Sequence, residues 1–373
     1  MGLQVQEQRG NNPNLSGKGQ RPAYRLFKLK GNHMARDDVH ILGIANNTLW
    51  YIIYYANKLS WHMYENVYSE ENNYAELGTV ADVGCATVGP NLLHVLLTSN
   101  TGLWHTYRNA PSNQDTHWQP GFGYVNGQES NSADAGTFRN IRAAGTTAGD
   151  GTLHVVGDGI GGSWHTIRWD SGYWQPSYDF IEFSNTSSQV TNSACAADAH
   201  GNLFVWAFSY TLDGLPQYEL LIRDESGKWS TSTTWHPLPT NGLLSQLSLA
   251  TDGRGNLASI MVTDQGTLYG TLYFASKKQW PQGWATLAPN GEIPVNADDP
   301  QNFVDASCAF LSNGDLVLLA IGSNSTTTQG LFRTTYSMDT RTWQPWTSIN
   351  AQMANPGQTG PFIRCGIGIS TAS

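Results

Sequence analysis

The sequence of 373 residues has few charged side chains and no long apolar segment. Asp, Glu, Lys and Arg make up 13% of it, against about 25% in a typical soluble domain. The formal net charge is -9, which disfavours nucleic acid and anionic membranes as partners, because both require clustered Lys and Arg. No stretch approaches the roughly 18 consecutive apolar residues of a membrane helix. We therefore expect no nucleic-acid partner and no membrane insertion.

The first residues lack the apolar core of a secretory signal peptide. We therefore expect a cytoplasmic protein, or one released or secreted by a non-classical route. Residues 9–20 are rich in Asn, Gly and Pro, which is typical of a flexible segment. We expect a flexible arm over residues 1–22 and a single domain over residues 23–373.

Cysteines are few, and none forms a Cys-x-x-Cys pair. Each of the four lies among small residues, in the segments Gly84-Cys85-Ala86, Ala194-Cys195-Ala196, Ser307-Cys308-Ala309 and Arg364-Cys365-Gly366. They mark one position of a repeat, where Ala143-Ala144 and Gly43 stand in two other copies. This favours a crowded position filled by small buried thiols, with disulfides or a metal as lesser alternatives. No Asp or Glu recurs beside the histidines, so we expect no metal site and no cofactor.

Glycine, tryptophan and tyrosine are abundant, with 39, 14 and 16 residues, and they follow a repeat. Two copies contain Leu93-His94-Val95 followed by Leu103-Trp104-His105-Thr106-Tyr107-Arg108, and Leu153-His154-Val155 followed by Trp164-His165-Thr166-Ile167-Arg168. The paired histidines are eleven positions apart in both copies, and Tyr51 and His62 keep this offset in a third. A unit that recurs at about 40 to 50 residues indicates a repeat architecture.

Each copy contains four short apolar or aromatic runs divided by Gly and Asn turns, which predicts a four-stranded meander. Second strands start near Thr48, Leu92, Thr152, Asn202, Asn256 and Asp315. Residues 362–370 look like a seventh first strand with no sequel, so its outer strands must come from residues 23–29, with residues 3–8 as further material. We predict an all-β protein, a seven-bladed β-propeller of four-stranded antiparallel blades whose closing blade is shared by the N- and C-termini. The alternative is a six-bladed ring with an added edge strand.

The third strand of the two clear copies supplies side chains that suit sugar binding. Trp104, Thr106 and Arg108 share one face of a strand, and His105 and Tyr107 share the other. A pyranose stacks its apolar face on an aromatic ring, its hydroxyls need hydrogen-bond partners, and a repeated weak site gains affinity by multivalency. Packing between blades explains a recurring Trp equally well, and a hydrogen bond in the core explains a recurring His. The candidate sugar-binding residues are Trp104, His105, Thr106, Arg108, Trp118, Trp164, His165, Thr166, Arg168, Trp174, Trp61 and His62.

Two other functions stay open. A propeller glycoside hydrolase or sialidase-like enzyme needs two carboxylates, or a Tyr nucleophile with acidic residues and an arginine cluster. The acidic residues here lie in connecting segments without recurrence, and no Ser-x-Asp-x-Gly-x-Thr-Trp box is present, so we expect no catalytic residues and no enzyme. A protein-interaction propeller would instead expose an apolar patch.

These motifs resemble the repeat of the bacterial seven-bladed propeller lectins of the Photorhabdus and Xenorhabdus type. Both clear copies show Leu-His-Val, then Trp-His-Thr and Arg, then Trp-Gln-Pro at Trp118 and Trp174. The resemblance covers nearly the whole chain from about residue 23. It implies binding of L-fucose and related glycans or glycoproteins, including O-methylated or galactose-type sugars, at pockets between blades, with a role in host recognition. The third strands at residues 218–223, 268–272 and 331–335 depart from the motif, so we expect fewer working sites than blades. Assembly into a homo-oligomer is left open.

Overall fold

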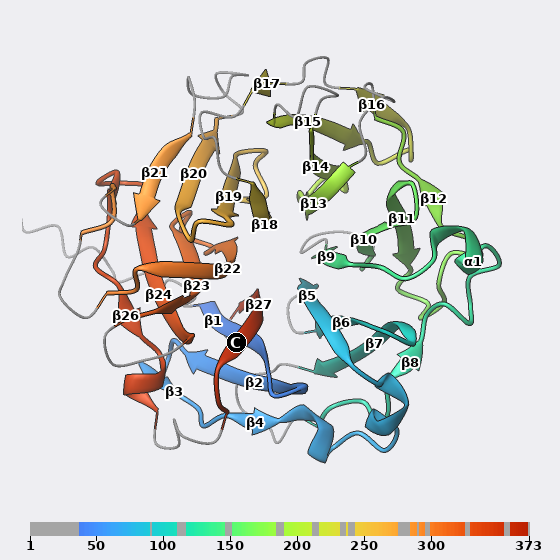
Figure 1. Cartoon of the computed structure of the whole chain (residues 1–373), viewed down its shortest axis with the longest axis horizontal. Helices are drawn as coiled ribbons and strands as arrows, with labels where there is room; N and C mark the ends of the chain where they lie inside the picture. Colours follow the sequence, from blue (N-terminus) through green and yellow to red (C-terminus); the bar gives the residue numbers. More distant parts are fainter. Residues whose placement is uncertain are drawn as a thin grey trace, which may run out of the picture. The chain divides into compact units, whose positions relative to one another are not determined.

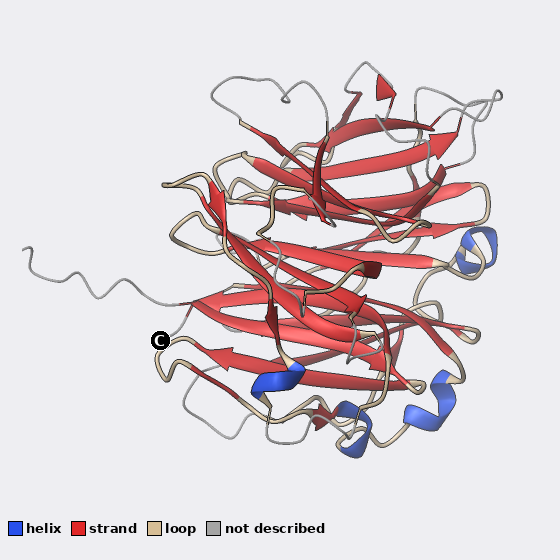
Figure 2. Cartoon of the chain, turned by 60° about the vertical axis from the view of Figure 1, so that its left-hand side comes forward, coloured by secondary structure: helices blue, strands red, loops and turns tan. Residues whose placement is uncertain are grey.

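The computed structural model describes residues 37–89, 92–109, 117–145, 151–183, 190–210, 216–231, 236–237, 243–274, 284–288, 291–294, 299–324, 329–353 and 359–371. These residues form six antiparallel sheets, the blades, arranged in a ring (Figure 1). Residues of the innermost strands line a cavity at the centre of the ring, called the central channel below. Strands dominate, and the helices are short turns at the periphery (Figure 2). The structure is therefore a β-propeller. In the described part of the chain, no helix is long and apolar enough to cross a membrane.

The blades are numbered in chain order, and their strands are given from the channel outwards. Blade 1 contains β27 (Phe362–Thr371), β1 (Asp37–Ala45), β2 (Thr48–Tyr55), β3 (Ser60–Trp61) and β4 (Glu65–Asn66); blade 2 contains β5 (Val80–Val88), β6 (Leu92–Ser99), β7 (Gly102–Asn109) and β8 (Gly123–Tyr124); blade 3 contains β9 (Asn140–Gly145), β10 (Leu153–Gly159), β11 (Gly162–Arg168) and β12 (Asp179–Phe180).

The other three blades follow the same order. Blade 4 contains β13 (Val190–Ala197), β14 (Leu203–Tyr210), β15 (Pro216–Arg223), β16 (Trp229–Thr231) and β17 (His236–Pro237); blade 5 contains β18 (Leu244–Thr251), β19 (Leu257–Thr263), β20 (Leu268–Tyr273) and β21 (Ala285–Ala288); blade 6 contains β22 (Asn302–Phe310), β23 (Leu316–Ser323), β24 (Gly330–Ser337), β25 (Thr342–Trp343) and β26 (Thr347–Ser348). Short helices occupy the connections: η1 (Val67–Ser69), η2 (Tyr74–Leu77), α1 (Ser132–Ala135) and η4 (Asn350–Gln352).

Local sequence explains the hairpins and the stacking of blades. Asn46 and Asn47 have φ of 50° and 58°, the left-handed pair that a two-residue turn between β1 and β2 requires, and Asn tolerates this conformation. Strands two and three are apolar on both faces, as in β14, where Phe204 and Trp206 face blade 5 and Leu203 and Val205 face blade 3. Each blade is covered on both sides by its neighbours, so almost every strand residue contributes to the core.

The prediction of seven blades is wrong, and the described residues form six. β27 is the innermost strand of blade 1, as expected for the C-terminal strand, but its outer partners are β1, β2 and β3. The error is one of register in the first copy. His40 and Tyr51, eleven residues apart, are hydrogen-bonded at 2.8 Å across β1 and β2. Tyr51 therefore lies on a third strand, where a second strand was expected.

Residues 23–29 and 3–8, predicted as outer strands of the closing blade, lie outside the described residues, and the places next to β27 are taken by β1 and β2. The six-bladed alternative is correct in the number of blades, but β27 is not a strand added to a complete ring, because it forms the innermost strand of blade 1. Residues 1–36 lie outside the described part, so the predicted arm over residues 1–22 and the domain boundary at residue 23 stay predictions.

The cysteines are free and buried, as predicted, but they do not share one register. Cys85, Cys195 and Cys308 line the central channel. In blade 1 the residue that lines the channel is Ile367, two positions after Cys365 on β27. The backbone N–H of Cys365 donates to Asp305 Oδ2 at 2.7 Å. Gly43 is not an inner residue either. It pairs with Cys365 from β1, and a Cβ there would lie 2.6 Å from the Phe362 ring.

Candidate functional site

Most predicted sugar-binding residues lie at the seams, a term used here for the packed faces between neighbouring blades. On β7, Thr106 and Arg108 face blade 1, where Thr106 Oγ1 donates to Glu71 Oε1 at 2.7 Å and Arg108 forms an ion pair with Glu65. His105 lies on the opposite face of β7 because side chains alternate along a strand. The motif therefore serves two seams at once.

The histidine pairs tie the second strand to the third inside a blade. His94 Nδ1 lies 2.8 Å from His105 Nε2 in blade 2, and His154 Nδ1 lies 3.1 Å from His165 Nε2 in blade 3. Burial lowers the pKa of His94 to about 3 and holds that of His105 well below its ordinary value. Burial also lowers the pKa of His165, a shift that Asp179 partly offsets. His94, His105 and His165 are therefore neutral. In the His94–His105 pair, an N–H of one ring donates to the bare nitrogen of the other.

The tryptophans of the predicted set are also largely packed. The side chains of Trp104, Trp118 and Trp174 lie in the core, with 5%, 3% and 8% of their surface exposed, and Trp164 is partly exposed. Thr166 is buried, and its hydroxyl donates to Glu129 Oε1 at 2.5 Å. Sugar contact by these residues and by their neighbouring histidines stays a prediction.

Seam 1/2 is filled by its own side chains. Tyr51 and Trp118 pack edge to face with 5.3 Å between ring centroids. The Arg108 guanidinium carbon lies 4.7 Å from the Tyr51 centroid and 5.7 Å from that of Trp118, an arrangement that favours cation–π attraction. Glu65 closes the arrangement by pairing with Arg108, whose side chain is only 8% exposed. Arginine, carboxylate and aromatic rings are thus matched within the protein.

Seam 6/1 is open and contains a cavity of about 470 Å³. Its walls are formed by Tyr54, Leu59, Ser60, Trp61, Arg333, Thr347, Ile349 and Gln352. Tyr54 and Trp61 lie 5.1 Å apart between centroids, and Trp61 Nε1 donates to Gln352 Oε1 at 2.5 Å. The Arg333 guanidinium carbon lies 5.0 Å from the Tyr54 ring and 5.7 Å from the Trp61 ring. The cavity therefore combines an aromatic platform, a cation and amide and hydroxyl groups.

Seam 6/1 uses the same strand positions as seam 1/2, but the arginine and the tyrosine have changed places. In the strand ladders, Arg333 is paired with Thr347 as Tyr51 is paired with Glu65. Opposite them, Tyr54 is paired with Trp61, the arrangement that Arg108 and Trp118 have in blade 2. Thr347 thus occupies the place of a carboxylate. Burial lowers the pKa of Arg333, and within the described residues its guanidinium has no hydrogen bond or ion pair.

The sequence reasoning found Trp61 at this cavity and missed Tyr54, Arg333 and Gln352. It took Trp61 and His62 for a third-strand motif, whereas Trp61 belongs to β3, a fourth strand, and the true counterparts of Trp104 and His105 are Trp50 and Tyr51. Aligning Phe332-Arg333-Thr334 with Trp104-His105-Thr106 would have located Arg333, because Arg333 and His105 share one register. His62 lies outside the cavity walls, with Nδ1 3.1 Å from Glu65 Oε1.

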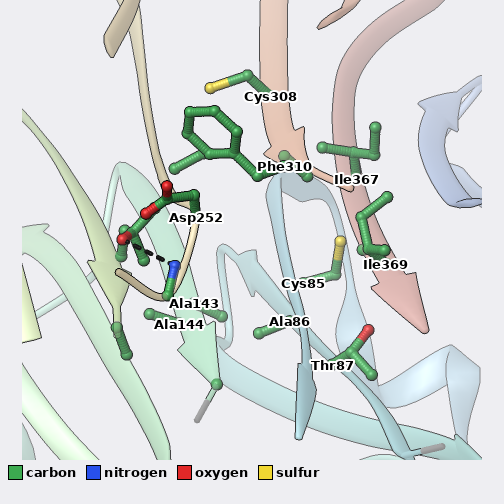
Figure 3. A pocket seen from close by; sticks show the side chains of 18 of the residues that line it. Cys85, Ala86, Thr87, Ala143, Ala144, Asp252, Cys308, Phe310, Ile367 and Ile369 are labelled. Carbon is green, nitrogen blue, oxygen red and sulfur yellow. Dashed lines mark hydrogen bonds between the residues drawn. The ribbon is translucent and has the colours of Figure 1, made fainter. Parts of the chain in front are cut away.

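A second cavity, of about 300 Å³, occupies one end of the central channel (Figure 3). Cys85 and Cys308 point into it together with Ala143, Phe310 and Ile369 (Figure 3). Burial raises the pKa of the channel thiols Cys85, Cys195 and Cys308 to about 12. These thiols are therefore protonated and weak nucleophiles. Among the residues that the structure describes, no group of three or more His, Cys, Asp or Glu could hold a metal ion.

Comparison with known proteins identifies the fold. No protein-family model and no curated protein matches the sequence. Among solved structures, AofleA from Arthrobotrys oligospora is 12% identical, with 91% of both chains covered and a TM-score of 0.52. The BP39L lectin from Burkholderia pseudomallei is 11% identical over 84% of this chain and 96% of its own, with a TM-score of 0.50. A Hadza microbial sialidase, Hz136, is 11% identical over 79% of this chain and 65% of its own, with a TM-score of 0.51. The fold is shared with a lectin and an enzyme, so function has to be argued from the site.

Proposed function

We propose that this propeller binds carbohydrate without catalysis, and that the cavity of seam 6/1 is its principal sugar site. The observation that carries the proposal is the partly exposed Trp61 ring beside Gln352, Ser60 and Arg333 in one concavity. An aromatic face with convergent polar groups is the construction that small polar ligands with an apolar face require. Fucose-type glycans are the proposed ligands because of the resemblance of the repeat to propeller lectins.

The composition of the cavity supports binding over hydrolysis. A retaining or inverting glycosidase needs two carboxyl groups, and a sialidase-like enzyme needs a Tyr nucleophile backed by acidic residues and arginines. The described residues that line the cavity include Tyr54 and Arg333 but neither Asp nor Glu. A general acid is thus lacking among them.

Seam 2/3 supports a second, weaker site and hence multivalent binding. Gly123 holds the ladder position that Glu65 holds in blade 1, and a Cβ on it would meet only the His105 carbonyl oxygen, at 3.7 Å. Arg168 is partly exposed, with its guanidinium carbon 5.6 Å from the Tyr107 ring. We keep Arg168 and Trp174 as proposed contacts, since two weak sites on one molecule raise avidity on a glycan surface.

A glycan array followed by calorimetric titration tests the proposal. We expect binding of fucosylated or galactosylated probes, and we expect Trp61→Ala to reduce the affinity at least tenfold. Tyr173→Ala is the matched control, because Tyr173 is an aromatic residue that is 73% exposed and lies outside the cavity walls. Failure of the wild-type protein to bind any of these probes would refute the lectin proposal. Hydrolysis of a chromogenic glycoside would favour the hydrolase.

A further inference from the structure

The seams differ in whether a carboxylate stands beside the arginine, and this difference bears on the charge of the ligand. In seam 1/2 the Arg108 charge is met by Glu65. In seam 3/4 the same ladder position, opposite His165, holds Asp179, whose Oδ2 lies 3.8 Å from His165 Nδ1. In seam 6/1 the equivalent ladder position holds Thr347. The ladder position that holds a carboxylate in seams 1/2 and 3/4, and that pairs with an arginine in seam 1/2, therefore holds a threonine where the cavity is open.

Arg333 is a partly buried cation without a carboxylate partner among the described residues. Its environment is two aromatic rings, which attract a cation weakly compared with a charge-assisted hydrogen bond. Arg333 lines the cavity, and a guanidinium carries several N–H donors in a planar fork that fits carboxylate or sulfate oxygens. Water and neutral hydroxyls can satisfy these donors, but only an anion also balances the charge.

We propose that the seam 6/1 cavity recognises a saccharide through an anionic substituent, a sulfate or a carboxylate, that pairs with Arg333. This rests on the proposed sugar-binding function and specifies the ligand class of the same cavity. Trp61 and Tyr54 bind the apolar face of the sugar ring, and Arg333 selects the acidic sugar over its neutral parent. The protein as a whole is negatively charged, so only the local positive charge of Arg333 attracts an anionic sugar. This attraction acts at contact range and weakens as the salt concentration rises.

Matched pairs of sugars test the proposal by calorimetry: L-fucose against a fucose sulfate, and galactose against galacturonic acid, with sodium sulfate alone as a third arm. We expect at least one anionic sugar to bind tenfold or more tighter than its neutral parent, with affinity falling as NaCl rises. The sulfate and uronate arms identify which anion is preferred. Binding of free sulfate as tight as that of the sulfated sugar would show an ion site without saccharide recognition and would overturn the proposal.

Thr347→Glu is the decisive variant because it rebuilds the carboxylate of seam 1/2 opposite Arg333. Thr347 is exposed at the end of its ladder, so the fold tolerates the change, and an unchanged melting temperature verifies this. We expect the variant to lose tenfold or more in affinity for the anionic sugar and less than twofold for the neutral one, while Thr347→Gln keeps both. If neutral and anionic sugars bind with equal affinity, and Trp61→Ala abolishes the binding of both, the anion proposal is overturned and the lectin proposal stands. Absence of all sugar binding would overturn both.

Discussion

Two buried glutamates join blades through the same set of contacts. Glu71 and Glu129 lie in the connections that lead into blades 2 and 3, where each accepts a hydrogen bond from a third-strand threonine. The second carboxyl oxygen of each is buried without a partner among the described residues. Burial raises the pKa of both glutamates to about 7, partly offset by the threonine hydroxyls. The protonated acid therefore fits these sites better than the carboxylate does.

Stability should consequently fall as pH rises. A glutamate whose pKa is near 7 in the folded state and near 4.5 in the unfolded chain stabilises the fold below pH 4.5, loses that contribution between these values and contributes nothing further above them. We expect Glu71→Gln with Glu129→Gln to remove a decline of about 1 to 3 kcal/mol per site in the free energy of unfolding. Urea unfolding at pH 5 and pH 8 measures it.

Glutamine keeps an acceptor oxygen for Thr106 and Thr166, so the variant isolates the titration from the hydrogen bond. Glu182→Gln, at an exposed position of blade 3, is the control and should leave the pH profile of the wild type unchanged. A double variant that shows the same fall in stability between pH 5 and 8 as the wild type would contradict the raised pKa values.

In blade 2, the hydrogen bond between His94 and His105 links β6 to β7. Replacing His94 by Leu leaves a buried nitrogen of His105 without its partner, which costs about 1 to 3 kcal/mol of unfolding free energy. The double variant His94→Leu with His105→Leu should cost less than the sum of the single variants, because no polar atom is then stranded. Urea unfolding of the four proteins of the cycle gives the coupling, and additive costs would show that the two rings act independently.

The sequence predicted the strands of blades 2 and 3 well because turns, apolar runs and paired histidines recur there in one register. The same signals misplaced blade 1, since His40 and Tyr51 retain the spacing but only one histidine of the pair. Whether a strand is second or third depends on its pairing with β27, a contact between residues more than 300 positions apart. Local periodicity carries no information on that pairing.

The site was harder to predict than the fold for a related reason. The aromatic and polar residues of the motif recur because blades must pack, so a regular copy does not by itself mark an open seam, and the copy that contains Trp118 and Arg108 borders the filled seam 1/2. The open cavity arises where the pattern changes, with Arg333 in the histidine position and Thr347 in the glutamate position. A departure from a repeat can be read as decay or as function, and the cavity between β24 and β3 becomes evident only from coordinates.

At the scale of the ring, polar contacts at the channel connect blades that are distant in sequence. Arg142 on β9 donates to Asp82 of blade 2 at 2.7 Å and to Gln246 of blade 5 at 2.6 Å. Asp82 and Asp305 accept backbone N–H groups of the next inner strand at 2.9 and 2.7 Å. Arg142 thus offsets the buried aspartates, and the inner strands hold one another in a closed circle.

Closure of that circle through β27 makes the propeller cooperative. Without β27, the inner edge of β1 would be unpaired, and the buried Phe362, Cys365 and Ile367 would leave a gap between β22 and β5. An exposed apolar edge is a template for aggregation.

We therefore expect a chain truncated before residue 362 to yield no folded monomer. Removal of residues 372–373, beyond the last described residue, should leave the urea midpoint unchanged. Size-exclusion chromatography and near-ultraviolet circular dichroism of both truncations measure this, and a peptide of residues 359–371 added during refolding should restore part of the monomer. A native-like spectrum and midpoint in the long truncation would mean that five complete blades and an open sixth suffice, and that β27 is an accessory strand.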